Sequence, residues 1–403
     1  MSTSGLSKAR LGRMHDVMAG HVERGAIPGL VTLVSRRGET HVDAIGTKAL
    51  GGSEPMARDT IFRIASMTKP ITAVGAMVLV EECTLRLDEP VDSWLPELSN
   101  RRVLRRLDAA LDDTVPGARP ITLRDLLTFR MGVGVVMAPS GTYPICDAMR
   151  DLQLGGMGPP RPHEQPATDE WMRRLGALPL MHQPDEKWMY HTASDVLGVL
   201  IERASGQRLE VFLHDRVLEQ LGMKDTGFSV SPSQLDRLAA CYEPDAETGT
   251  LRLFDGVSDS QWSTPPAFAS GGGGLVSTID DILAFGQMML DAGMTGGERL
   301  LSRPSIEMMT TDHLTPEQKA RSEFAPGYWE SNGWGFGMSV ATKRVDASSA
   351  PGRFGWFGGL GTAWYSDPYE EMVTVLMTQR SGFPLYWDVF VDFMTGAYQA
   401  IDD

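Results

Sequence analysis

Cysteine is scarce in this chain of 403 residues, which has only three, at widely separated positions. Cys83, Cys146 and Cys241 are odd in number, and none has a histidine at metal-ligand spacing, so they indicate reduced thiols rather than a disulfide framework. No stretch approaches the ~18 to 20 continuous apolar residues of a membrane span. The first residues contain no apolar segment typical of a secretory signal. These absences predict a cytoplasmic protein.

Positive charge is also in short supply, because 37 Lys and Arg residues face 52 Asp and Glu residues and the formal net charge is −15. A chain this acidic is a poor partner for nucleic acid or for an anionic membrane surface. The chain also lacks Gly-x-Ser-x-Gly, His-Glu-x-x-His, Cys-x-x-Cys and the phosphate-binding Gly-x-x-x-x-Gly-Lys. An α/β-hydrolase triad therefore has no obvious nucleophile, and neither a metal nor a nucleotide cofactor is indicated.

The chain contains a single Ser-x-x-Lys sequence, formed by Ser66 and Lys69. It lies between a predicted strand over residues 61–64 and an apolar run over 71–80 whose spacing predicts a helix. Pro70 has no amide hydrogen and is tolerated only in the first turn of a helix, so this helix should begin close to Ser66. Lys69 would then lie one turn away on the same face, where its amine can help remove the hydroxyl proton. Ser66 is therefore a candidate nucleophile.

A structural interpretation of the same motif stays open. Ser66 could be a helix N-cap and Lys69 a solvated residue of the first turn. A Ser-x-x-Lys sequence is expected about once or twice by chance in a chain of this length. The motif alone therefore does not decide between the two interpretations.

Tyr190 lies just before a helix predicted over residues 192–204, where its hydroxyl could face a cleft. The ordinary pKa of a tyrosine is about 10, so Tyr190 would need nearby positive charge, such as Lys69, to act as a base near neutrality. His191 is an alternative base, which we rank second. A half-buried tyrosine with a bonded hydroxyl is the structural alternative.

Glycines are concentrated over residues 354–362, ahead of a predicted strand. Glycine lets a backbone approach a ligand closely, so an N–H group here could complete an oxyanion hole with the N–H of Ser66. The structural alternative is a glycine-rich strand edge or hairpin turn. A second glycine run, over 271–274, is interpreted as a flexible turn before a helix over 278–290.

Strand-like sequence lies near both ends of the chain, and helical patterns lie between. Strands are predicted over 30–35, 41–45, 336–342, 362–366 and 372–378, and further helices over 122–128, 168–178, 209–221 and 386–401. The early hairpin has too few strands for a stable sheet, so the late strands should join it. The predicted fold is α/β (α+β), an antiparallel sheet flanked by helices. Residues 1–90 and 265–403 would form this α/β domain, and 91–264 an inserted all-helical domain.

Three motifs in chain order resemble those of the serine β-lactamase and penicillin-binding-protein superfamily. They are Ser66 to Lys69, the sequence beginning Tyr190-His191-Thr192, and Trp356-Phe357-Gly358. Their order and separation resemble the class C β-lactamase branch, and most of all the family VIII carboxylesterases. Residues 59–91, 121–128 and 273–281 also resemble the family, so the likeness covers most of the chain.

The resemblance implies an active site at the junction of an α/β domain and an all-helical domain. It implies that Ser66 is the acylated nucleophile and that Lys69 and Tyr190 activate it. Tyr190 would pass the proton to the leaving group and later activate water. The oxyanion hole would consist of the backbone N–H groups of Ser66 and Gly359.

Departures from the β-lactamase pattern bear on the substrate. Trp356, Phe357 and Gly358 replace Lys-Thr-Gly, which removes the cation expected to hold a substrate carboxylate. Thr192 stands where relatives have asparagine, and Phe129 begins a segment that replaces a His-Thr-Ser-Gly-like turn. We expect Trp356, Phe357, Gly358 and Phe129 to contact substrate, since an apolar, aromatic cleft suits an uncharged acyl group better than a β-lactam nucleus.

The predicted function is that of a carboxylesterase, which cleaves small to medium acyl esters through an acyl-enzyme on Ser66. The same mechanism leaves open acyl transfer to an alcohol or amine, and hydrolysis of an amide or a β-lactam. A non-catalytic binding module is a further alternative, against which the intact Ser66, Lys69 and Tyr190 count. The loop over 131–166 is expected to shape the acyl pocket. The natural ester, its chain length and any homo-oligomer are left open.

Overall fold

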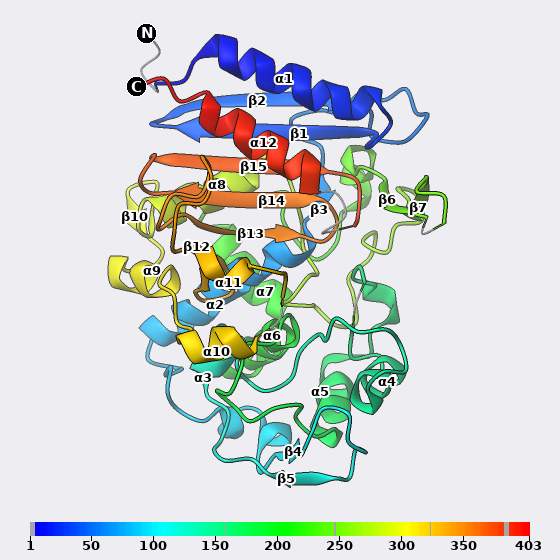
Figure 1. The fold of residues 1–403 in the computed structure, drawn as a ribbon, viewed down its shortest axis with the longest axis vertical. Coiled ribbons are helices and arrows are strands. Elements are labelled where there is room, and N and C mark those ends of the chain that lie inside the picture. The colour runs from blue at the N-terminus through cyan, green and yellow to red at the C-terminus, as the bar shows by residue number, and fades with distance from the viewer. Residues whose placement is uncertain (1–4, 157, 246, 323, 383–386) are drawn as a thin grey trace.

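A seven-stranded antiparallel sheet, built from both ends of the chain, forms the centre of the structure (Figure 1). The computed structural model describes residues 5–156, 158–245, 247–322, 324–382 and 387–403. The strand order is β11-β12-β13-β14-β15-β1-β2. The strands are β1 (Gly29–Arg36), β2 (Glu39–Gly46), β11 (Asn332–Trp334), β12 (Ser339–Ala341), β13 (Phe354–Gly358), β14 (Thr362–Asp367) and β15 (Met372–Thr378). Because β1 pairs with β15, the N-terminal hairpin and the C-terminal strands share one ladder, as predicted.

The composition of the central strands explains their position in the sheet. All residues of β1 and β15 are buried, and both strands are rich in the apolar side chains typical of strands covered on both faces. Helices α1 (Lys8–Glu23) and α12 (Trp387–Gln399) lie over one face, and α8 (Ile279–Leu290) packs against β14 and β15 from the other (Figure 1). The sheet is therefore a buried layer between two layers of helix.

Helices dominate the chain between the two halves of the sheet. They are α3 (Leu123–Leu127), α4 (Pro144–Asp151), α5 (Thr168–Ala177), α6 (Thr192–Ser205) and α7 (Leu209–Leu213). Two short ribbons accompany them, β4 (Arg102–Leu104) with β5 (Thr114–Pro116), and β6 (Cys241–Pro244) with β7 (Leu251–Asp255). In Figure 1, α3, α4, α5 and the β4–β5 ribbon lie at the end of the molecule away from the sheet. The predicted fold class, an antiparallel sheet flanked by helices, is confirmed. The insertion is mainly but not entirely helical, because the two ribbons lie within it, and the boundaries at 90, 91, 264 and 265 stay predictions.

The remaining elements are short and connect these layers. They are β3 (Phe62–Arg63), β8 (Val276–Ser277), β9 (Met294–Thr295), β10 (Glu298–Arg299), α9 (Arg303–Met309), α10 (Pro316–Arg321) and α11 (Tyr328–Ser331). β3 and β8 pair with each other, which ties the strand before Ser66 to the chain before α8. None of the helices in the described ranges has the length and apolar character that crossing a bilayer requires.

Several predicted elements differ in extent from those observed. The helix predicted over 209–221 is α7 followed by one π-helical stretch, His214–Leu218. The strand predicted over 336–342 is too long, because Gly337 has φ +73° and only Ser339–Ala341 pairs. Helix α4 lies in the stretch expected to be a long loop. The first residue of the predicted terminal helix, Tyr386, lies outside the described residues.

Helix α2 (Thr68–Glu81) is the element that brings the sheet and the inserted helices together. Twelve of its 14 residues are buried, and they lie on every face of the helix, as expected for a core helix. α6 packs along it, and a methyl group at Gly75 would come within 2.7 Å of Leu213 in α7. The start of α2 therefore lies at the junction of the two parts of the chain.

Candidate active site

Ser66 lies in a 3₁₀ turn, Ala65–Met67, that leads directly into α2. Ala65 has φ +43°, a left-handed conformation that is uncommon for a residue other than glycine and is often found at functional turns. Pro70 falls in the first turn of α2, as predicted. Lys69 Nζ donates a hydrogen bond of 2.8 Å to Ser66 Oγ. The structure therefore brings the two side chains of the Ser-x-x-Lys motif into direct contact.

Lys69 is fully buried, with an exposed fraction of 0%, whereas Ser66 is partly exposed. Its Nζ atom also lies 3.0 Å from His191 Nδ1 and donates to the carbonyl oxygen of Gly272. Burial disfavours the ammonium form and lowers the pKa of Lys69 from 10.5 to about 7, although the carboxylate of Asp195 acts in the opposite direction. Near neutrality a large share of Lys69 is therefore a neutral amine that can accept a proton.

Tyr190 lies against the same hydroxyl. Its hydroxyl oxygen accepts a 2.8 Å bond from Trp356 Nε1, and the side chain of Ser66 lies close enough to act on the pKa of the phenol. Lys69 Nζ lies 4.7 Å from the centre of the tyrosine ring. The backbone of Tyr190 is fixed by a bond of 2.8 Å from the Val135 N–H, so the loop predicted to shape the site does reach it.

The pKa of Tyr190 departs from the sequence expectation. Tyr190 needs a lowered pKa to act as a base near neutrality, yet burial among aromatic rings raises the pKa of the phenol above its ordinary value of 10. The side chains of Ser66 and Trp356 lower the pKa of the phenol and oppose this rise only in part. Tyr190 is therefore a neutral phenol near pH 7, able to donate a proton, and Lys69 is the better base.

The residues expected to bind substrate lie around Tyr190 at different depths. The exposed fractions of Phe129 and Trp356 are 1% and 0%, so both pack behind Tyr190. Their ring centroids lie 6.1 and 5.7 Å from that of Tyr190. Phe357 stacks on Trp356 with a centroid separation of 4.3 Å. Phe324, which the sequence analysis missed, is half-buried and lies 5.6 Å from the ring of Tyr190. The result is an aromatic wall beside Ser66.

The end of β13 packs against the backbone that precedes Ser66. A methyl group at Gly358 would lie 2.2 Å from the carbonyl oxygen of Ile64, and Thr362 Oγ1 donates to the same oxygen at 3.2 Å. Gly359 follows at the exposed turn between β13 and β14. Within the part of the chain that the structure describes, its N–H group has no hydrogen-bond acceptor. This geometry is compatible with the predicted oxyanion hole, which stays a prediction.

Two further residues of the site escaped the sequence analysis. Asp195 is buried in α6, 3.2 Å from His191 Nε2, and it accepts a bond of 2.9 Å from the Gly272 N–H. The run 271–274 is a turn, as predicted, but it also provides the carbonyl group that contacts Lys69. The sequence signal that could have identified Asp195 is an acidic residue four positions after His191, inside an otherwise apolar helical run. Gly272, which donates to Asp195, is distant in sequence, so no local pattern could predict the contact.

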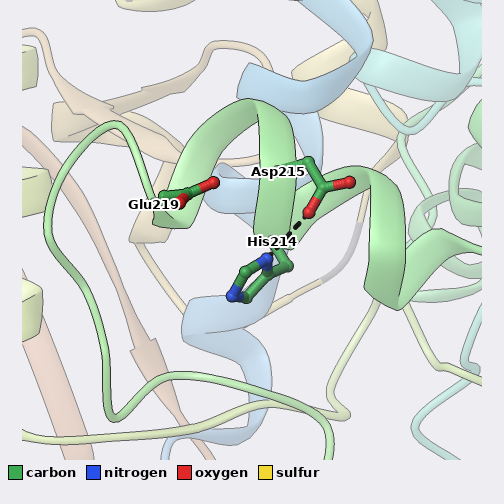
Figure 2. A group of neighbouring side chains, drawn as sticks. All are labelled: His214, Asp215 and Glu219. Carbon is green, nitrogen blue, oxygen red and sulfur yellow. Dashed lines mark hydrogen bonds and ion pairs between the residues drawn. The ribbon is translucent and has the colours of Figure 1, made fainter.

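One group of side chains in the described ranges has the donor types and spacing of a metal site, and it lies elsewhere. His214, Asp215 and Glu219 are exposed on the π-helical stretch and the turn after it (Figure 2). His214 Nδ1 lies 2.8 Å from Asp215 Oδ1, a contact that an ordinary surface pair also makes. The groups around Ser66 are an amine, a phenol, an imidazole and backbone carbonyl and N–H groups. An antiparallel sheet, an inserted helical region and a Ser-x-x-Lys turn at their junction define a protein of the serine β-lactamase and penicillin-binding-protein fold.

Comparison with known proteins agrees with this assignment. The sequence matches the Beta-lactamase family over residues 14–388. Protein Rv1367c of Mycobacterium tuberculosis is 40% identical over 366 residues, which span 89% of this chain and 87% of that protein. Esterase EstB of Burkholderia gladioli is 30% identical over 382 residues, which span 88% and 86%. The solved structure of EstCE1, a hydrolase with promiscuous acyltransferase activity, aligns with a TM-score of 0.77 at 24% identity and covers 97% of this chain and 99% of that one. The chain belongs to the Beta-lactamase family.

Proposed function

We propose that this protein is a serine hydrolase, specifically a carboxylesterase that cleaves small to medium acyl esters through an acyl-enzyme on Ser66. The observation that carries the proposal is the placement of two proton-handling groups on one partly exposed hydroxyl. Lys69 Nζ lies 2.8 Å from Ser66 Oγ, and the phenol of Tyr190 lies close enough to the same side chain for Ser66 to act on its pKa. A nucleophile flanked by a base and an acid is the arrangement that acyl transfer requires.

In the acylation step, Ser66 Oγ attacks the ester carbonyl carbon and its proton passes to the neutral amine of Lys69. The carbonyl π electrons move to the oxygen, where the N–H groups of Ser66 and Gly359 would stabilise the negative charge. When the tetrahedral intermediate collapses, the bond to the leaving alkoxide breaks, and that oxygen takes the Tyr190 proton. The Lys69 ammonium then returns a proton to Tyr190, which restores both resting groups.

In the deacylation step, water replaces the leaving alcohol. Lys69 takes the water proton through the Tyr190 hydroxyl while the water oxygen bonds to the acyl carbon. The oxyanion then re-forms the carbonyl, the bond from that carbon to Ser66 Oγ breaks, Ser66 Oγ takes a proton from the Lys69 ammonium, and the carboxylic acid departs. An alcohol in place of water gives a new ester instead, so acyl transfer is the alternative outcome of the same steps.

The surroundings of Ser66 favour an uncharged acyl group. Trp356 stands where the β-lactamase pattern has a lysine, and its indole N–H is already used by Tyr190. Phe324 and Phe357 add apolar surface beside it, with centroids 5.7 and 4.3 Å from that of Trp356. A relative at 30% identity, EstB, is named as an esterase, which supports the same class of substrate.

Hydrolysis of p-nitrophenyl butyrate tests the proposal. We expect turnover by the wild type and by Ser233→Ala, a matched change at an exposed serine, and none by Ser66→Ala or Tyr190→Phe, with circular dichroism confirming folding. A serine-directed phosphonate should label Ser66 in the wild type. Adding 1-butanol as acceptor measures the share of acyl transfer, and nitrocefin measures β-lactam hydrolysis. A folded wild type that neither turns over ester nor takes the label at Ser66 would refute the proposal.

A further inference from the structure

Three acceptors surround the amine of Lys69. They are Ser66 Oγ at 2.8 Å, His191 Nδ1 at 3.0 Å and the carbonyl oxygen of Gly272. An ammonium has three N–H donors, so the protonated side chain can satisfy all three contacts at once. The neutral amine has only two N–H groups and one lone pair. Which contact receives the lone pair decides whether Lys69 can take a proton from Ser66.

Asp195 determines which nitrogen of His191 carries the proton. A carboxylate can only accept hydrogen bonds, and Asp195 Oδ2 lies 3.2 Å from His191 Nε2. Nε2 therefore carries the hydrogen, and the lone pair of Nδ1 faces Lys69. The carboxylate itself is held through its other oxygen, which accepts bonds from Ser270 Oγ at 2.6 Å and from the Gly272 N–H at 2.9 Å.

We infer that Asp195 and His191 are positioning residues for Lys69, a role that rests on the proposed function. His191 Nδ1 and the Gly272 carbonyl accept both N–H groups of the neutral amine, so its lone pair is directed at the Ser66 hydroxyl. During acylation the Ser66 proton moves onto that lone pair while Oγ bonds to the acyl carbon. The resulting ammonium finds all three of its acceptors already in place.

The backbone supports this role. His191 has φ +82° and ψ −67°, a conformation rarely adopted by a residue other than glycine, and strain of this kind clusters at functional sites. At Gly272 a methyl group would come within 2.9 Å of Asp195 Oδ1 and 3.1 Å of His191 Cε1. The contact of His191 and Asp195 with Lys69 therefore requires a strained backbone at His191 and a glycine at position 272.

An ordinary stabilising pair at the start of α6 is the competing interpretation, and it predicts a different result. His191 and Asp195 are separated by four residues, a spacing that stabilises many helices. Such a role would affect only the thermal stability of the fold. A positioning role would change the reactivity of Ser66 and its pH dependence. The titratable groups around Lys69 are Tyr190, His191 and Asp195, since the turn at 271–274 provides only backbone groups.

The test uses three variants. Asp195→Asn keeps Oδ1 for Ser270 and Gly272 but places an amide N–H₂ opposite Nε2, so the imidazole must present Nδ1–H to Lys69. His191→Leu removes the Nδ1 acceptor that faces Lys69. His191→Asn replaces it with a side-chain amide oxygen at about the position of Nδ1. The matched control is His182→Leu, because His182 and Glu186 form another pair with the same spacing. Circular dichroism and thermal melting confirm folding, and His191→Leu carries the test if Asp195→Asn does not fold.

The measurement is the rate at which a fluorophosphonate labels Ser66 between pH 5.5 and 9, together with kcat and KM for p-nitrophenyl butyrate. We expect Asp195→Asn and His191→Leu to lower the labelling rate and kcat at least tenfold while KM stays within about twofold. The acid limb of the Asp195→Asn profile should move to lower pH, because the carboxylate no longer favours the ammonium. His191→Asn should recover most of the rate. Wild-type rates and profiles in the folded variants, with only a lower Tm, would overturn the inference. A wild type that neither labels nor turns over ester refutes the proposed function itself, and the inference with it.

Discussion

Trp356 Nε1 donates a 2.8 Å hydrogen bond to the hydroxyl oxygen of Tyr190, and the two ring centroids lie 5.7 Å apart. The donor lies on β13 and the acceptor just before α6, so this bond joins the sheet to the inserted helices. Because the indole N–H points at the phenol oxygen, the O–H of Tyr190 is left to donate elsewhere. The side chain of Ser66 is the other polar side chain that acts on this phenol.

Trp356→Phe should therefore reduce turnover more than it reduces stability. The variant keeps an aromatic ring but loses a hydrogen bond worth about 1 kcal/mol, which corresponds to roughly a fivefold to tenfold fall in kcat. The matched control is Trp334→Phe, in the same cluster with its centroid 4.7 Å from that of Trp356. The indole N–H of Trp334 has no partner among the described residues, so its loss should leave kcat close to wild type. Equal kcat values for the two variants would contradict the role of the bond.

The pH dependence of the reaction should follow the titration of Lys69. The ammonium form cannot accept a proton, and burial lowers its pKa to about 7, so kcat/KM should rise with pH through this value and then level off. Lys69→Arg keeps a positive charge that cannot titrate in this range, so its profile should lack this rise, and we expect a loss of ~10²- to 10⁴-fold in kcat on the plateau above pH 7. Initial rates between pH 5.5 and 9 measure both. A profile that is flat across pH 7 would show that Lys69 is not the base.

Two adjacent glycines provide a test of the turn after β13. A methyl group at Gly358 would lie 2.2 Å from the Ile64 carbonyl oxygen, whereas at Gly359 it would meet no heavy atom within 4 Å. Gly358→Ala should therefore displace β13 from the Ser66 turn and lower both kcat and Tm. Gly359→Ala retains the backbone N–H and should leave Tm unchanged. Thermal melting and phosphonate labelling of the two variants test this difference. A fall in Tm and labelling for Gly358→Ala alone would show that Gly358 is required for packing, whereas equal falls in both variants would show that the turn tolerates no side chain at either position.

Local patterns explain why so much of the sheet could be predicted. The hairpin formed by β1 and β2 has two β-rich runs around a short polar turn, and β15 matches its predicted range, 372–378, at both ends. The errors in predicted helices and strands occur where tertiary contacts, rather than the local pattern, determine the secondary structure. α4 lies in a stretch rich in Gly, Met and Pro, and β12 is cut short by the left-handed conformation of Gly337.

In the candidate site, too, contacts between residues close in sequence could be predicted and contacts between distant residues could not. Ser66 and Lys69 are three residues apart, so helical geometry alone predicts their contact, and the structure shows it. Asp195 and Gly272 are separated by 77 residues, and their hydrogen bond depends on how the turn before β8 folds over α6. The raised pKa of Tyr190 likewise depends on rings from distant segments, including Phe324. Such contacts leave no periodic signal in one sequence.

The strand before Ser66 is held by a buried ion pair, which leads to a prediction about stability. The side chains of Arg63 and Asp255 are 2% and 3% exposed, and Arg63 Nε donates to Asp255 Oδ2 at 2.7 Å. Asp255→Ala would leave a buried guanidinium without its counter-charge, and breaking such a pair typically costs about 3–5 kcal/mol. We expect a clear fall in Tm and in the urea midpoint of unfolding at pH 7.

The matched control for this pair is Asp108→Ala, which breaks a contact of similar geometry with Arg106 at the surface. Arg106 Nε lies 3.0 Å from Asp108 Oδ1, but the two side chains are 76% and 54% exposed, so water replaces the lost partner. Asp108→Ala should therefore leave the Tm unchanged. Equal Tm values for the two variants would mean that the other hydrogen bonds of Arg63, to Gly256 and Ser260, compensate for the lost carboxylate. Since Arg63 lies three residues before Ser66, a destabilised Asp255→Ala should also label more slowly with the phosphonate at temperatures below its Tm.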